Sequence, residues 1–263
     1  MQAPAPADLV TGLMVEVPTP DGLCDAFYAA PTTGRHPAVL IWPDIFGLRP
    51  AFQAMAHRLA GAGHAVLVVN PFYRQLRAPT APQGTATPFA EVRPLRAALS
   101  PATLAVDAQA LLDWLAQRPE VQPLARMGVV GYCMGGAMAV RTAALAPTRI
   151  GAAASFHGGH LVTAEADSPH HGLARSQARF LIAVAANDDA QDPQAQHTLR
   201  DALAAAQRPG EVEVYPAAHG WCPPDSQVHD AQQAERAWQR LLALLTTARQ
   251  MPQGPKTAAR PEG

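Results

Sequence analysis

The chain reads Gly131-Tyr132-Cys133-Met134-Gly135-Gly136 directly after an apolar run at residues 127–130. The pattern G-x-C-x-G predicts a strand, a sharp turn at Cys133 and an Ala-rich helix directly after it. A nucleophile on so tight a turn has a strained backbone, so the residues two positions before and after it must be small. Gly131 and Gly135 meet that requirement. The stretch predicts a nucleophile elbow built on cysteine, although a buried structural cysteine in a glycine-rich turn would leave the same pattern.

The helix expected after the turn bears on the chemistry of the cysteine. Its N-terminus would aim free N–H groups and the positive end of the helix dipole at the sulfur of Cys133. Such surroundings favour the thiolate, which is the nucleophilic form.

Two later strand patterns end in residues that could serve this cysteine. Residues 180–186 read as a buried strand followed by Asn187-Asp188-Asp189, and residues 211–215 alternate like a strand before the loop that carries His219. Open α/β sheets place functional groups on loops at the carboxyl ends of their strands. The chain order nucleophile, acid, histidine is that of elbow-bearing hydrolases. We therefore predict a triad of Cys133, one of the two aspartates and His219.

Composition indicates one sizeable globular domain, which we place at residues 9–249. The chain has 263 residues, of which 48% are hydrophobic and 16% are charged. Its formal net charge of −1 gives no electrostatic basis for binding nucleic acid or an anionic membrane surface. No apolar run approaches the ~20 residues that span a bilayer, so we expect no membrane partner.

The cysteine and lysine content narrows the class of protein further. Cys24, Cys133 and Cys222 lack the spacing of a disulfide framework, and the N-terminus shows no secretory signal. Both observations fit a reducing, cytoplasmic compartment. No metal-ligand motif occurs, so we expect neither a metal nor a cofactor. The only lysine is Lys256, which argues against Schiff-base and P-loop enzymes.

Strand and helix patterns alternate along most of the chain. An edge hairpin is expected at residues 13–28, with its turn at Pro20-Asp21-Gly22. Ser100-Pro101 begins a helix with proline in its first turn. Further strands are expected at 37–42, 65–69 and 152–156, and further helices at 52–62 and 235–245. This alternation predicts an α/β fold with a doubly wound, mostly parallel sheet flanked by helices.

Three segments fall outside the alternation. Residues 1–8 and 250–263 are rich in Pro, Gln and Ala, and we expect both to be disordered. Residues 71–99 hold four arginines and several prolines without a clear period. They form either a surface excursion or a cap over the active site, and both interpretations stay open.

Together these motifs resemble the dienelactone hydrolase family, whose members have the α/β-hydrolase fold. The resemblance covers about residues 13–246 and includes Pro43-Asp44-Ile45-Phe46-Gly47 after the first central strand. It implies a hydrolase that acts on a small ester or lactone. We expect a monomer or a small homo-oligomer.

The resemblance also implies a mechanism through an acyl-thioester. Cys133 would attack the carbonyl, and His219 would hold the cysteine as thiolate and later activate water. The backbone N–H groups of Met134 and Ile45 would form the oxyanion hole. A thiolate is a soft nucleophile, so activated esters and enol-lactones suit it better than amides.

The acid of the triad is open between two neighbours. Asp188 follows its strand in the A-x-x-D fashion of relatives, whereas Asp189 has their spacing to Pro193. We favour Asp188, and we expect the other aspartate to cap the helix that starts near Pro193.

Two positions depart from the family's pattern. Asp44 stands where the family has a glutamate near the nucleophile, and it either reaches Cys133 or caps the following helix. Pro223 stands where dienelactone-specific members have an arginine that binds the substrate carboxylate. Arg93 or Arg96 could replace that charge, or either could be a solvated surface residue. We do not expect dienelactone itself to be the substrate.

Four further side chains near the motifs are ambiguous. Tyr132 and Trp221 flank the nucleophile and the histidine, and they either line the pocket or pack in the core. His157 and His160 follow a strand and either reach the rim of the site or have no function.

A second class of function uses the same cysteine. A non-hydrolytic member of the fold could bind a small molecule or sense oxidation through Cys133, because an accessible thiolate is what a redox sensor needs. The intact histidine and acid favour the hydrolase. Cys24 and Cys222 are expected to be unreactive thiols.

Overall fold

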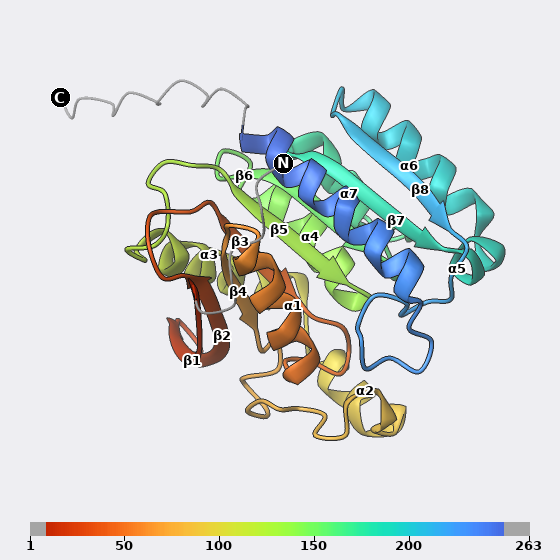
Figure 1. The fold of residues 1–263 in the computed structure, drawn as a ribbon. Coiled ribbons are helices and arrows are strands. Elements are labelled where there is room, and N and C mark those ends of the chain that lie inside the picture. Colours follow the sequence, from red (N-terminus) through yellow and green to blue (C-terminus); the bar gives the residue numbers. More distant parts are fainter. Residues whose placement is uncertain (1–8, 250–263) are drawn as a thin grey trace.

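A mixed eight-stranded sheet forms the centre of the molecule in the computed structural model, which describes residues 9–249 (Figure 1). The strand order is β1-β2-β4-β3-β5-β6-β7-β8. The strands are β1 (Val10–Thr19), β2 (Gly22–Pro31), β3 (Ala38–Trp42), β4 (Ala65–Val69), β5 (Met127–Tyr132), β6 (Ile150–Phe156), β7 (Arg179–Ala185) and β8 (Gly210–Tyr215). The termini expected to be disordered, 1–8 and 250–263, lie outside the described residues.

The sheet is antiparallel at one edge and parallel elsewhere. β1 and β2 form a hairpin in which Thr19 pairs with Gly22, as the turn sequence predicts. β2 then joins β4 antiparallel, and every neighbouring pair from β4 to β8 is parallel. The predicted doubly wound, mostly parallel sheet is confirmed.

Helices cover both faces of this sheet. α1 (Pro50–Gly61) and α7 (Ala231–Arg249) pack on one face, and α3 (Pro101–Ala116), α4 (Met134–Leu145) and α6 (Pro193–Ala205) pack on the other (Figure 1). The predicted start of α3 is confirmed: Ser100 accepts a hydrogen bond from Thr103 N at 3.1 Å, and proline occupies the first turn. Smaller helical elements are α2 (Phe89–Ala97), α5 (Ala186–Gln191), η2 (Gly84–Ala86) and η3 (Pro169–Arg175).

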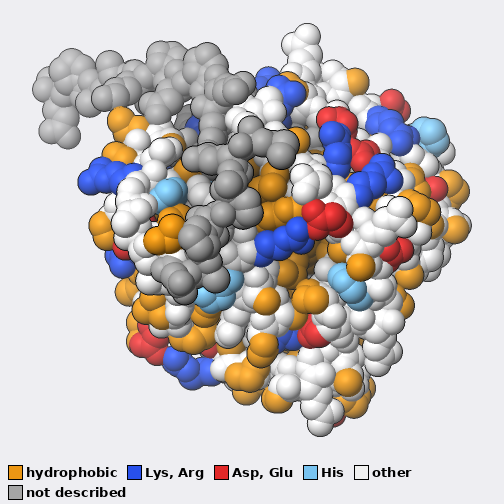
Figure 2. Space-filling model, in the orientation of Figure 1, with side chains coloured by type: hydrophobic (Ala, Val, Ile, Leu, Met, Phe, Trp, Pro, Cys, Tyr) orange, Lys and Arg blue, Asp and Glu red, His pale blue; other side chains and the backbone are white. Residues whose placement is uncertain are grey.

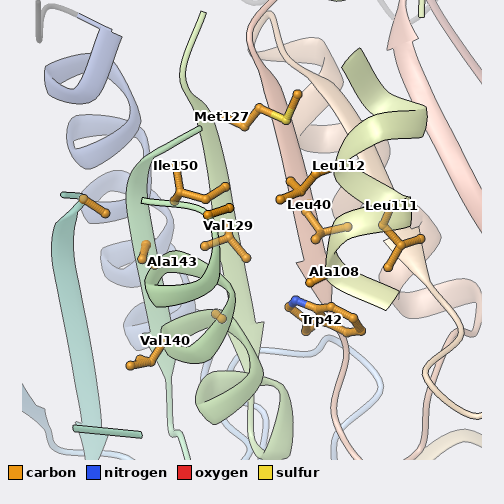
Figure 3. Packing of buried hydrophobic residues seen from close by; sticks show 14 of the residues in the cluster. Leu40, Trp42, Ala108, Leu111, Leu112, Met127, Val129, Val140, Ala143 and Ile150 are labelled. Atoms are coloured by element: carbon orange, nitrogen blue, oxygen red, sulfur yellow. The ribbon is translucent and has the colours of Figure 1, made fainter. Parts of the chain in front are cut away.

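Apolar residues from both layers bury the sheet. Strands β3 and β4 are buried at every position, which explains their continuous apolar runs. Figure 3 shows part of the core between the sheet and helices α3 and α4. The labelled side chains are Leu40, Trp42, Ala108, Leu111, Leu112, Met127, Val129, Val140, Ala143 and Ile150.

The segment 71–99 contains helices that its sequence did not predict. α2 has Pro94 in its interior and buries only Val92, so neither its composition nor its period resembles that of a core helix. The last helix, α7, is longer than the predicted 235–245 at both ends. The carboxyl ends of the parallel strands all lie on the same side of the sheet. The candidate functional residues lie in the segments that follow these strand ends.

Candidate active site

Cys133 occupies the turn between β5 and α4 in a left-handed conformation. Its φ is 53° and its ψ is −120°, which a non-glycine residue adopts only where the surroundings enforce it. A Cβ on Gly131 would lie 1.8 Å from the carbonyl oxygen of Gly135, and one on Gly135 would lie 2.2 Å from that of Trp42. Only glycine fits at these two positions, so the predicted elbow is built as its sequence demands.

His219 lies between an aspartate and the cysteine. Its Nδ1 and the Oδ2 of Asp188 are 2.7 Å apart, and the Cys133 side chain is close enough to affect its pKa. Burial of the ring opposes the charged form. The interactions with Asp188 and Cys133 outweigh it and raise the pKa of His219 to about 10. The geometry therefore favours an imidazolium next to the sulfur.

The loops that carry this pair are fastened to each other. The backbone N–H of His219 donates to Oδ1 of Asn187 at 2.7 Å, and that of Ala186 donates to the carbonyl of Ala217 at 3.0 Å. Asn187 directly precedes the aspartate, and the sequence interpretation gave it no role. The side chain of Asn187 therefore fixes the loop of His219 next to Asp188.

Asp188 and Asp189 have different partners. Asp188 faces His219, whereas Oδ1 of Asp189 accepts a hydrogen bond from Gln196 at 2.7 Å. Both lie in the first turn of the short helix α5 rather than on a loop. The expectation that the other aspartate caps the helix at Pro193 is wrong, because Asp192 is the residue that caps α6.

Met134 and Ile45, the predicted oxyanion donors, lie in one small apolar cluster. Met134 is the first residue of α4, so its N–H has no partner within the helix. The backbone around Ile45 is fixed by Asp44, whose Oδ1 accepts from Phe46 N at 2.9 Å.

Asp44 takes neither of its predicted roles. It does not cap α1, whose N-cap is Arg49 without a side-chain hydrogen bond, and its carboxylate binds Arg49 at 2.7 and 3.0 Å instead of Cys133. Arg49 also binds both carboxylate oxygens of Asp225, at 2.6 and 2.9 Å. Because Asp225 follows the loop of His219, this cluster connects the loop of Asp44 and Ile45 with the loop of His219.

His157 contacts the elbow. Its ring is fully buried, and its Nδ1 accepts a hydrogen bond from the backbone N–H of Cys133 at 3.1 Å. The ring centroid lies 5.2 Å from that of His219 and 4.9 Å from that of Trp221. Burial, together with the charge of His219, holds the pKa of His157 well below its usual range, so the ring is neutral. His157 is therefore a buried neighbour of Cys133 rather than a residue at the rim of the site.

Other ambiguous side chains are core residues. Trp221 is fully buried and stacks on Tyr215 at 4.9 Å, and Tyr132 stacks on Phe156 at 5.4 Å. Cys24 and Cys222 are buried, and burial raises the pKa of each thiol. Cys133 is the more exposed of the three cysteines.

The segment 71–99 covers the oxyanion side. Val92 of α2 packs in the same apolar cluster as Ile45 and Met134, which supports the cap interpretation. Arg93 and Arg96 lie on the exposed side of α2. His160 is exposed on its loop.

Two kinds of site are absent from the described part of the chain. Within residues 9–249, no cluster of His, Cys, Asp or Glu side chains is arranged to hold a metal ion. None of the helices in this range is long and apolar enough to cross a membrane.

Comparisons with known proteins identify the family of the chain. The model of the "Dienelactone hydrolase family" matches residues 24–249. A "Putative carboxymethylenebutenolidase" of Synechocystis sp. is 27% identical over 89% of this chain and 96% of its own length. The carboxymethylenebutenolidase of Rhodococcus opacus is 28% identical over 47% of this chain and 44% of its own.

A solved structure shares the fold. The "Putative Dienelactone Hydrolase" of Klebsiella pneumoniae superposes with a TM-score of 0.78 at 25% identity, covering 90% of this chain and 98% of that one. The chain therefore belongs to the dienelactone hydrolase family and is a hydrolase of the dienelactone type.

Proposed function

We propose that this chain hydrolyses a small ester or lactone through a triad of Cys133, His219 and Asp188. One observation carries the proposal: His219 is hydrogen-bonded to Asp188 at 2.7 Å, and its ring also interacts with the side chain of Cys133. A histidine held in this way keeps the sulfur as thiolate and itself as imidazolium. The substrate carbonyl carbon then forms a bond with the sulfur.

The remaining steps follow from the placement of the other groups. Negative charge that develops on the carbonyl oxygen is stabilised by the N–H groups of Met134 and Ile45. The imidazolium of His219 gives its proton to the departing alkoxide. In the second half, neutral His219 takes a proton from water as the water attacks the thioester, and the thiolate leaves.

The charges around the site favour a neutral substrate. The family's carboxylate-binding arginine position is Pro223 here, and Arg93 and Arg96 lie on the exposed side of α2. The buried cation near the oxyanion loop, Arg49, is fully committed to two aspartates. We therefore expect activated neutral esters and enol-lactones to be hydrolysed faster than anionic ones.

The decisive test uses Cys133→Ala with Cys222→Ala as the matched control. With p-nitrophenyl acetate, Cys133→Ala is expected to lose hydrolysis and Cys222→Ala to keep it, because Cys222 is a buried thiol that does not belong to the proposed triad. Intact-mass spectrometry of the wild type, quenched during turnover, should show one acetyl group on Cys133. Full activity in Cys133→Ala would overturn the proposal and favour binding or redox sensing.

A further inference from the structure

A cavity opens on the α1/α7 face of the sheet, between these two helices. Its volume is about 360 Å³. Figure 2 looks onto this face, where hydrophobic side chains lie between charged ones. The wall residues used below are Ile41, Ala54, Met55, Leu59, Ala234 and Trp238. Neither Cys133 nor His219 is among the residues that line it.

The size and lining suit a small organic molecule. Ligand pockets in proteins usually span ~300–1,000 Å³, and an apolar cavity of about 150 Å³ already binds benzene. The walls contributed by both helices and β3 are mostly aliphatic or aromatic. Water has few partners in such a space, since it needs two to four hydrogen bonds to be held.

One polar group of the cavity wall is the hydroxyl of Tyr132. Tyr132 is 94% buried, because only 6% of its surface is exposed, and it lines the cavity. Its ring packs against Phe52 and Phe156, but no hydrogen bond of its hydroxyl occurs within residues 9–249. A buried tyrosine hydroxyl normally finds a partner. Burial raises the pKa of Tyr132 well above its usual value, so the hydroxyl stays a neutral donor.

The mouth of the cavity carries no unbalanced charge. Arg58 forms an ion pair with Glu235, and its guanidinium lies 4.2 Å from the ring centroid of Trp238. All three residues line the cavity. A charged ligand would find no unpaired opposite charge there. A neutral ligand could pass without breaking the ion pair of Arg58 and Glu235.

We propose that this α1/α7 cavity is a second small-molecule site, which takes a neutral, apolar molecule whose one acceptor oxygen is bound by the hydroxyl of Tyr132. The site goes beyond the proposed hydrolysis. Two of its lining residues are close in sequence to the proposed triad. Tyr132 directly precedes Cys133, and Cys222 lies three residues after His219.

Acetophenone is a suitable probe, because it has an apolar ring, one carbonyl oxygen and no ester bond. Calorimetry is expected to show binding to the wild type. Tyr132→Phe should weaken acetophenone about 2- to 10-fold, the effect of one net hydrogen bond. Ethylbenzene, which has the same shape without the oxygen, should bind both proteins equally.

Two cavity-filling variants locate the site. Ala234→Phe fills the cavity from α7 and Ala54→Phe fills it from α1, and each should abolish binding. Neither wall residue is fully buried, so both variants are expected to fold, and circular dichroism checks this. Gln232→Phe, exposed on α7 and outside the lining, is the control that should bind as the wild type does.

Three results would overturn the site. They are the absence of binding up to the solubility of acetophenone, unchanged binding in both filled variants, and equal loss of acetophenone and ethylbenzene in Tyr132→Phe. Because the readout is binding of a compound that is not hydrolysed, its failure leaves the proposed hydrolysis untouched. Cys133→Ala, which is expected to lose hydrolysis, should still bind acetophenone.

Discussion

Two cation–carboxylate groups at the same edge of the sheet are built in opposite ways. The Asp188–His219 pair has side chains 28–29% exposed and one hydrogen bond between them. In the Asp44–Arg49–Asp225 cluster, Arg49 is 1% exposed and uses its donors on two carboxylates and the carbonyl of Gly47. The imidazole of His219 can exchange a proton and move slightly, whereas the guanidinium of Arg49 always keeps its positive charge. One group is suited to chemistry and the other to holding the chemistry in place.

Removing the histidine should have the largest effect. His219→Ala is expected to lower kcat about 10⁴-fold, the upper range for a positioned acid–base group, because nothing else in the site can hold the thiolate or activate water. The fold should survive, since the side chain lies on a loop and is partly exposed. His160→Ala, an exposed loop histidine, is the control and should keep the wild-type rate. A near-wild-type rate in His219→Ala would remove it from the mechanism.

Breaking the fixed cluster should act mainly on stability. Arg49→Met leaves the buried carboxylate of Asp44 without its cation, which costs about 3–5 kcal/mol. For a domain of this size the melting temperature should fall by roughly 10 °C. Arg77→Met, which breaks the exposed pair with Glu16, should change the stability little, because solvent screens this pair.

Thermal unfolding of the two arginine variants measures this contrast. Residual activity of Arg49→Met well below its melting temperature then reports on the oxyanion loop, which this cluster connects to the histidine loop. Equal melting temperatures for the two variants would mean that the Asp44–Arg49–Asp225 cluster does not stabilise the fold.

The neighbouring aspartates offer a smaller and sharper contrast. Asp188→Asn removes the charge that faces His219 and should lower kcat about 10²-fold, the lower range for acid–base assistance. Asp189→Asn changes only a hydrogen bond with Gln196 and should keep most of the rate. Steady-state kinetics on one ester decides between them. Similar mild losses in both variants would mean that the acid lies elsewhere.

The parts of the site that could be predicted depend on local physics. The elbow could be predicted because the two glycines that its steric crowding requires, Gly131 and Gly135, lie within six consecutive residues. The positions of the acid and histidine follow from strand patterns that end in polar residues. The family resemblance then supplied the oxyanion donors.

The parts that could not be predicted depend on contacts distant in sequence. Arg49 and Asp225 are 176 residues apart, and nothing near either residue marks them as partners. His157 resembles any loop histidine until the sheet places its ring next to Cys133, 24 residues away. The cap of α6 was misplaced because the short helix α5 absorbs Asp188 and Asp189, which leaves Asp192 at the start of the next helix.

A separate effect should appear in the pH dependence of stability. The pKa of His219 is raised to about 10 from a usual value near 6.5, because its interactions with Asp188 and Cys133 outweigh burial. The folded state therefore binds this proton more tightly than the unfolded state does. The stabilisation is fully present below about pH 6.5 and is lost as the pH rises through 10.

Denaturant titrations of wild type and His219→Ala between pH 6 and 10 measure this loss. The difference in unfolding free energy between the two proteins should shrink steadily as the pH rises, since only the wild type has the proton to lose. Asp188→Asn should show a shallower slope, because one of the two interaction partners has lost its charge. A difference that stays constant with pH would mean that His219 is neutral in the resting protein, and that it acts on Cys133 as a base only when substrate arrives.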